Sequence, residues 1–330
     1  GLDYLFPKKQ NTATPSLNIQ GDAISMMSAG VLYATLYTHV LREYFGVKPK
    51  AAMGYSMGEC SSMWYAFGIW NAVEGTKVFR NSPIFKNKFS GDLELLAEEW
   101  NISNKEAKAR WQSWILLESK EKVEDQISAF DKVSITFVNS KKELIVSGDK
   151  SQCEELIRTL NCASVLVPFQ NIIHNEFCKK EYDGLIEMHN FPLENKPEVD
   201  FYSSLTGDKI SMDSLIIAEN TTNVCHTTVD FPAFTKKMSA KGFSTFVELG
   251  PNSTCTNWIK DTLDQKKHAA CAIDKKGTSS IQSLYECLAQ LISNGIDIDL
   301  SLLYPNTNQK QLKKRFTKKV KTGGRHVYDV

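Results

Sequence analysis

The sequence predicts an α/β fold in which a small ferredoxin-like subdomain is inserted into a large α/β subdomain. Two observations carry this prediction. Helix-like and strand-like segments alternate along most of the chain, and those between residues 113 and 168 follow the order βαββαβ. We therefore assign residues 1–112 and 169–304 to the large subdomain, residues 113–168 to the small one and residues 305–330 to a basic C-terminal linker.

The composition is that of a folded globular protein. Of the 330 residues, 42% are apolar and 23% are charged. Lys and Arg number 39 against 38 Asp and Glu, and this balance favours neither nucleic acid nor an anionic membrane as the main partner. The best candidate for a membrane span, residues 51–73, is interrupted by Glu59 and Asn71, so we expect none.

The cysteines and the N-terminus indicate a compartment. The eight cysteines are scattered and include no Cys-x-x-Cys pair, which argues against a zinc site or a redox pair. The first residues lack the basic-then-apolar order of a signal peptide. These observations favour reduced thiols in a cytoplasmic protein without a bound metal.

The large subdomain begins with a helix, a strand and a second helix. Apolar residues recur every three or four positions over residues 23–45, and Gly46 follows as a stop signal. Residues 51–55 have the pattern of a short buried strand, and residues 56–67 have that of a helix starting directly at its end.

The next segments combine a capped helix with a run of charge. Asn71 and Glu74 form a capping arrangement for a helix that extends to Arg80. Residues 85–112 are rich in charged side chains, and we interpret them as a helical excursion on the surface.

The small subdomain contains four strand-like and two helix-like segments. The strands are expected at residues 114–117, 133–138, 143–146 and 163–167, and the helices at residues 120–130 and 151–160. After it, residues 201–204 and 243–249 have strand patterns, and residues 280–293 have that of an amphipathic helix.

The sharpest local signal is the pentapeptide G-x-S-x-G at residues 54–58. A serine on a tight turn between a strand and a helix has its Oγ pushed out of the backbone, and flanking glycines permit that turn. The helix beginning there directs free N–H groups and its positive dipole end to the same place. We therefore interpret Ser56 as a nucleophile in a hydrolase-like large subdomain and the Met57 N–H as an oxyanion donor. The alternative is a tight turn with an idle serine.

A serine nucleophile needs a base, and the sequence offers six histidines. They are His39, His174, His189, His226, His268 and His326. His268 would suit the Ser–acid–His order of α/β-hydrolases, but no clear acid-bearing strand end precedes it. His174 follows the last strand of the small subdomain, so it would face a cleft between the subdomains, where ligand sites tend to form. The alternative for His174 is an ordinary surface histidine.

These residues resemble a known family, the acyl-CoA:acyl carrier protein acyltransferases. It includes malonyl transacylases and the acyltransferase domains of polyketide and polyunsaturated fatty acid synthases. The family motif G-H-S-x-G-E, with a later arginine, is similar to residues 54–59 and Arg80, except that Tyr55 replaces the histidine. Three further segments follow the family order: residues 41–49 are similar to its L-x-x-x-G-x-x-P approach, residues 139–148 are similar to its N-S-x-x-x-x-V-S-G hairpin, and residues 246–251 match its F-x-E-x-G-P strand end. The 118-residue separation of Ser56 and His174 is also near that of the family.

The resemblance implies ping-pong acyl transfer from acyl-CoA to the phosphopantetheine thiol of an acyl carrier protein. His174 would be the base for Ser56, and a main-chain carbonyl at Asn223 or Val224 would orient it. Arg80 would bind the free carboxylate of a malonyl group through a bidentate pair, the alternative being a surface arginine at a helix end. No bound cofactor is implied, acyl-CoA is the substrate, and other synthase domains or subunits are partners.

The sequence departs from the family in two places. No G-Q-G-x-Q loop, which supplies the second oxyanion donor in the family, stands before Ser56, so that segment was removed, lies upstream, or this copy is impaired. Residues 171–173 match neither the malonyl nor the methylmalonyl signature. Tyr55 and the charged run are more similar to the acyltransferase domain of polyunsaturated fatty acid synthases than to a malonyl transacylase.

Three functions are open at this point. The first is acyl transfer from CoA to a carrier protein. The second is a serine hydrolase, such as an editing thioesterase that clears acyl groups from a carrier. The third is a non-catalytic module that docks a carrier protein.

Two further segments each allow a structural and a functional interpretation. The aromatic run at residues 63–67 is interpreted as core, with an acyl-chain tunnel as the alternative. The basic residues 310–325 are interpreted as a solvated linker, and a docking strip for an acidic carrier or CoA phosphates is the alternative. Nucleic-acid binding is disfavoured because no stacking aromatics interleave these charges.

Overall fold

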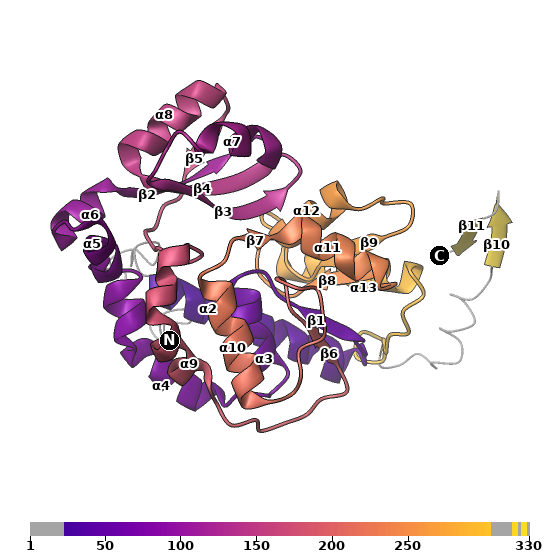
Figure 1. The fold of residues 1–330 in the computed structure, drawn as a ribbon. Coiled ribbons are helices and arrows are strands. Elements are labelled where there is room, and N and C mark those ends of the chain that lie inside the picture. The colour runs from indigo at the N-terminus through magenta and orange to yellow at the C-terminus, as the bar shows by residue number, and fades with distance from the viewer. Residues whose placement is uncertain (1–22, 305–318, 323–324, 329–330) are drawn as a thin grey trace, which may run out of the picture.

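The computed structural model describes residues 23–304, 319–322 and 325–328 (Figure 1). The large subdomain is built around short pairs of parallel strands. β1 (Ala51–Met53) pairs with β6 (Asp200–Tyr202), and β8 (Thr245–Glu248) pairs with β9 (Ala269–Ala272). Parallel neighbours need a crossover connection. The connection from β8 to β9 contains a helix, and that from β1 to β6 contains several helices and the inserted small subdomain. The α/β fold class expected from the alternating pattern is confirmed.

Helices make up most of the rest of the large subdomain. They are α2 (Ala23–His39), α3 (Met63–Ala66), α4 (Ala72–Asn81), α5 (Glu94–Trp100), α6 (Asn104–Arg110), α9 (Tyr182–His189), α10 (Ser214–Cys225), α11 (Phe231–Ala240), α12 (Thr254–Thr262) and α13 (Ser280–Ser293). Shorter turns are the π-helical η2 (Val40–Tyr44), η3 (Gly58–Ser62) and η4 (Ile84–Lys88) and the 3₁₀ turn η5 (Glu176–Glu181). The Asn71 side chain caps α4 as the sequence predicts, accepting hydrogen bonds from the Val73 and Glu74 N–H groups.

The inserted unit is ferredoxin-like. Its elements are β2 (Trp111–Leu116), α7 (Lys120–Ile127), β3 (Val133–Ser140), β4 (Glu143–Asp149), α8 (Lys150–Leu160) and β5 (Ser164–Leu166). The strand order is β5-β2-β4-β3, with every neighbour antiparallel. β7 (Val229–Asp230), from the large subdomain, adds to this sheet in parallel with β3. Figure 1 shows α7 and α8 on the face of the sheet that points away from the large subdomain.

The small subdomain has a core of its own. Leu116, Val123, Leu144, Val146 and Leu156 are fully buried together between its sheet and its two helices. The large subdomain contains separate buried clusters around its strand pairs. The insertion is therefore a packed unit that can present β3 to the large subdomain as a stable surface.

The charged segment at residues 85–112 corrects the expectation of a surface excursion. It is helical, but apolar side chains such as Phe85 and Leu95 are buried in a core cluster that also contains Cys60 and Val224. Its charges lie on the exposed faces of α5 and α6, so the charge count concealed an apolar face with helical spacing.

Most of the basic linker expected at residues 305–330 lies outside the described residues. Within that range, β10 (Lys319–Thr322) and β11 (Arg325–Tyr328) form an antiparallel pair. No helix in the described part of the chain has both the length and the apolar character needed to cross a bilayer. Nor do the described residues include a cluster of three or more His, Cys, Asp or Glu able to hold a metal ion.

Candidate active site

The turn at residues 54–58 places Ser56 between β1 and η3. Ser56 has a φ of 50°, in the left-handed region that residues other than glycine rarely adopt. Such backbone strain is typical of functional turns. The turn closes on itself, because Gly58 N–H donates to the Tyr55 carbonyl, and Glu59 and Cys60 N–H donate to the Ser56 carbonyl. None of these three bonds uses the Met57 N–H, the first amide after the serine. The strand–turn–helix predicted around Ser56 is present.

Gly54 is required by the close approach of the strand to the helix. A Cβ there would lie 2.0 Å from the Glu59 backbone nitrogen and 2.2 Å from the Gly58 carbonyl carbon. Gly58 has no such neighbour within 4 Å. The two glycines of the motif therefore differ, and only the first is demanded by space.

His174 meets Ser56 across 118 residues of sequence. The Ser56 Oγ lies 2.7 Å from the His174 Nε2. On the other side of the ring, Nδ1 lies 2.8 Å from the Val224 carbonyl and 3.1 Å from the Thr227 carbonyl. Carbonyl oxygens only accept, so Nδ1 carries the hydrogen, and the Nε2 of a neutral ring is free to accept from the serine hydroxyl.

Burial keeps this imidazole neutral. His174 is 2% exposed, and desolvation lowers its pKa from 6.5 to about 4, while the hydrogen bonds to Val224 and Thr227 oppose the shift. The ring of Phe137 in β3 meets the imidazole edge-on, with centroids 4.5 Å apart. His174 is thus an unprotonated acceptor at neutral pH, the state in which it can take a proton from Ser56.

A buried carboxylate holds the helical segment after Ser56 in place; we call this segment, made of η3 and α3, the elbow helix. Glu59 is fully buried, accepts hydrogen bonds from the Ser204 N–H (2.9 Å) and the Asn220 side chain (2.8 Å), and has a pKa raised by burial. These bonds join η3 to the chain after β6 and to α10. Glu59 therefore has a structural role here and does not pair with Arg80.

Tyr55 connects the turn to the small subdomain. Its hydroxyl donates to the Asn139 side chain at 2.7 Å, and its ring packs against Phe137 and Trp258. Both Asn139 and Phe137 lie on β3. The tyrosine in place of the motif histidine thus holds β3 against the turn that carries Ser56.

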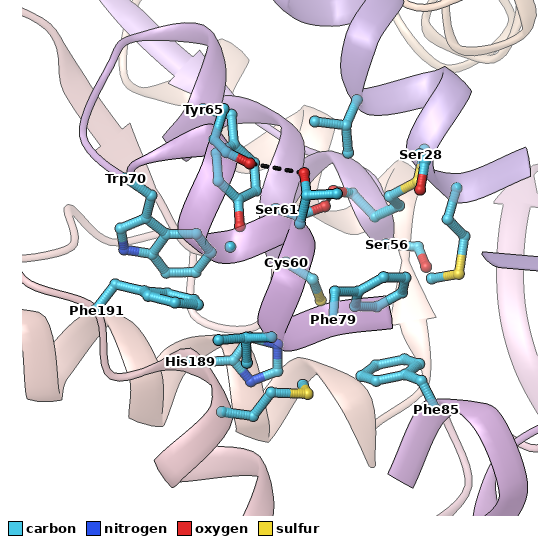
Figure 2. Close-up of a pocket in the computed structure, with 18 of the residues that line it drawn as sticks. Ser28, Ser56, Cys60, Ser61, Tyr65, Trp70, Phe79, Phe85, His189 and Phe191 are labelled. Carbon is cyan, nitrogen blue, oxygen red and sulfur yellow. Dashed lines mark hydrogen bonds between the residues drawn. The ribbon is translucent and has the colours of Figure 1, made fainter. Parts of the chain in front are cut away.

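A cavity of about 100 Å³ opens beside Ser56. Its walls come from α2, the elbow helix, α4 and α9, and they include Tyr65, Trp70, Phe79, Phe85 and Phe191. Figure 2 shows Ser56 at one end of these side chains and Trp70 and Phe191 at the other. The cavity therefore leads away from the serine into apolar surroundings.

The structure brings together some of the predicted site residues and leaves others apart. Ser56, Met57, His174 and Val224 meet at the turn. Asn223 does not orient His174, because the carbonyls that reach its ring belong to Val224 and Thr227. Arg80 is exposed in the last turn of α4 and does not line the cavity.

Other functional contacts had no signal in the sequence. The Thr227 contact with His174 is made by a main-chain carbonyl, which every residue has, so residue type does not reveal it. His189 and Phe191 also line the cavity. They follow the small subdomain in the sequence, and no motif marks them. Tyr65 belongs to the aromatic run at residues 63–67, in which Met63, Trp64 and Phe67 are buried core, while the Tyr65 side chain is partly buried and lines the cavity.

Residues 31–284 match the family described as acyl transferase domain. The chain belongs to this family. It is 24% identical to one of the subunits of the polyunsaturated fatty acid synthase of Thraustochytrium sp., covering 92% of this chain and 16% of the relative. It is also 24% identical to the polyketide synthase GfsB of Streptomyces halstedii, covering 81% of this chain and 5% of that relative. The chain thus spans a small part of the relatives it matches.

Solved structures of acyltransferases share the fold. The acyltransferase domain from the second module of the salinomycin polyketide synthase superposes with a TM-score of 0.70 at 16% identity, covering 97% of this chain and 68% of that one. Malonyl-CoA:acyl carrier protein transacylase from Helicobacter pylori gives a TM-score of 0.66 at 17% identity, covering 84% and 83%. At these identities, the similarity supports the architecture of this acyl transferase domain.

Proposed function

We propose that this acyl transferase domain moves an acyl group from CoA to the phosphopantetheine thiol of an acyl carrier protein through an ester on Ser56. The observation that carries the proposal is the 2.7 Å contact between Ser56 Oγ and a buried His174 whose other nitrogen is held by two carbonyls. A serine becomes a nucleophile when a positioned base can take its proton.

In the first half-reaction, Ser56 Oγ attacks the thioester carbonyl of acyl-CoA while the His174 Nε2 takes the hydroxyl proton. The oxyanion that forms is stabilised by the Met57 N–H at the start of the helix. The carbon–sulfur bond then breaks, the CoA sulfur takes the proton from His174, and the acyl group remains as an ester on Ser56.

In the second half-reaction, the thiol of the carrier attacks that ester. His174 takes the thiol proton and returns it to Ser56 Oγ as the carbon–oxygen bond breaks. The same neutral imidazole therefore serves in both directions, and burial suits it for this, because its pKa of about 4 leaves it unprotonated at neutral pH.

The choice of carrier protein as acceptor is supported by the names of relatives. One solved neighbour is a malonyl-CoA:acyl carrier protein transacylase, and the sequence relatives are parts of fatty acid and polyketide synthases. The name of that neighbour gives CoA and an acyl carrier protein as its two acyl carriers, so a carrier thiol is a better supported acceptor than water.

A two-step loading experiment tests the proposal. The protein is incubated with octanoyl-CoA or acetyl-CoA, CoA is removed, and a phosphopantetheinylated acyl carrier protein is added. Intact-mass spectrometry should show an added acyl mass on this chain, followed by its appearance on the carrier. Release of free acid without transfer would indicate a hydrolase instead. Absence of any adduct, together with carrier binding, would indicate a docking module.

A further inference from the structure

The cavity beside Ser56 has walls without charge. Among the described residues that line it, none is Lys, Arg, Asp or Glu. Aromatic and thioether side chains dominate, with Phe79 and Phe85 near the serine and Trp70 packed against Phe191 at the other end (Figure 2). A group that enters this cavity exchanges water for an apolar environment.

The polar side chains of the wall offer no positive charge either. The Ser61 hydroxyl donates to the Met57 carbonyl. His189 is buried, its Nδ1 lies 2.8 Å from the Leu185 carbonyl, and burial lowers its pKa to about 4. It is therefore neutral at pH 7 and stacks on Trp70.

A carboxylate in this cavity would have no cationic partner among the described residues that line it. Burying an ionised carboxylate without a paired cation is strongly unfavourable. Arg80, the cation that the resemblance suggested for this purpose, is exposed at the end of α4 and lies outside the lining.

We propose that the acyl group carried by Ser56 is an uncharged hydrocarbon chain longer than acetyl, and that malonyl and other dicarboxylic acyl groups are poor substrates. This inference rests on the proposed acyl transfer and specifies its substrate class. Each methylene buried in the cavity favours binding by about fourfold, from about 0.8 kcal/mol per CH₂, so the preference grows with chain length until Trp70 and Phe191 are reached.

The test is a competition among acyl-CoAs. Initial rates of adduct formation on the wild-type protein are measured by intact mass with malonyl-, acetyl- and octanoyl-CoA. We expect octanoyl to react at least tenfold faster than acetyl at low concentration, and malonyl to be the slowest. Malonyl reacting as fast as octanoyl would overturn the inference and leave acyl transfer intact. If none of the three forms an adduct, acyl transfer itself fails, and the inference fails with it.

A matched pair of variants on α4 assigns the preference to this cavity. Both side chains are exposed, but Thr76 lines the cavity and Val73, one turn away on the same helix, does not. In Thr76→Phe the added ring obstructs the cavity, and we expect the ratio of octanoyl to acetyl rates to fall at least tenfold. In Val73→Phe the ratio should stay within twofold of wild type. An unchanged ratio in Thr76→Phe, in a protein with wild-type circular dichroism, would show that the acyl chain binds outside this cavity and would overturn the inference.

Discussion

Two serine–histidine pairs in the described residues share nearly the same hydrogen-bond geometry. Ser56 Oγ lies 2.7 Å from the Nε2 of His174, and Ser239 Oγ lies 2.8 Å from the Nε2 of His268. Each histidine also has its Nδ1 near a main-chain carbonyl, at 2.8 Å for His174 and 3.0 Å for His268. Distances within the pair therefore do not distinguish a nucleophile from an ordinary hydrogen bond.

The surroundings of the two pairs differ in every respect that matters to acyl transfer. Ser56 is held at a φ of 50° before the positive end of a helix, none of the three hydrogen bonds of its turn uses the Met57 N–H, and it opens on the cavity. Ser239 lies in the last turn of α11, the carbonyl end, which disfavours negative charge, and it does not line the cavity. Backbone placement, more than the serine–histidine contact, makes Ser56 the candidate nucleophile.

The largest effect should come from removing the base. In His174→Gln the ring nitrogen that accepts the serine proton is lost, and we expect the rate of acyl-serine formation to fall by about 10²–10⁴-fold. His268→Gln is the matched control and should stay within twofold of wild type, measured with octanoyl-CoA by intact mass. A loss below tenfold in His174→Gln would remove its role as base.

The two glycines of the turn should respond differently to a methyl group. In Gly54→Ala the Cβ collides with backbone atoms of the elbow helix, so we expect a loss of about 3 kcal/mol or more in the free energy of unfolding. Gly58→Ala meets open space and should have a melting temperature equal to or slightly above that of wild type. Thermal unfolding followed by circular dichroism checks both. Equal destabilisation by the two substitutions would contradict the observed packing of the turn.

The pH dependence of acylation should reflect the burial of His174. With a pKa of about 4, about 97% of the imidazole is neutral at pH 5.5, whereas a pKa of 6.5 would leave about 9% neutral. We expect the rate to be nearly constant from pH 8 to 5.5. An approximately tenfold fall over that range, with the fold retained by circular dichroism, would contradict this environment.

The same shift affects stability with a defined sign. Because the unfolded imidazole binds a proton near pH 6.5 and the folded one only near pH 4, the free energy of unfolding decreases as the pH falls through this window. The contribution is fully present above pH 6.5.

The smallest effect should come from Arg80→Ala. Arg80 is exposed and outside the cavity lining, so rates with malonyl-, acetyl- and octanoyl-CoA should each change less than twofold. A tenfold loss confined to malonyl-CoA would instead establish Arg80 as a carboxylate clamp, as the resemblance implied.

Sequence reasoning reached the parts of the site that depend on local chain geometry. The strand, the tight turn and the helix around Ser56 follow from residue pattern, whereas the choice of His174 needed the spacing of the resembling family as well as its position after the small subdomain. The carbonyl of Thr227 could not be predicted, since any residue supplies one. The choice of Val224 over Asn223 depends on where α10 ends, to within a single residue.

The sequence also could not predict which side chains form the wall of the cavity. Trp70 and Phe191 are separated by 121 residues and meet only in the folded chain, with ring centroids 5.2 Å apart. The core role of residues 85–112 was hidden by their charges, because burial depends on which face of each helix the apolar side chains share.

The most direct measurement is the position of the acyl group after reaction with octanoyl-CoA, determined by peptide mapping of wild type, Ser56→Ala and Ser239→Ala. We predict an adduct on Ser56 in wild type and in Ser239→Ala, and none in Ser56→Ala. An adduct that persists in Ser56→Ala, or that maps to Ser239, would contradict the assignment of Ser56 as the nucleophile.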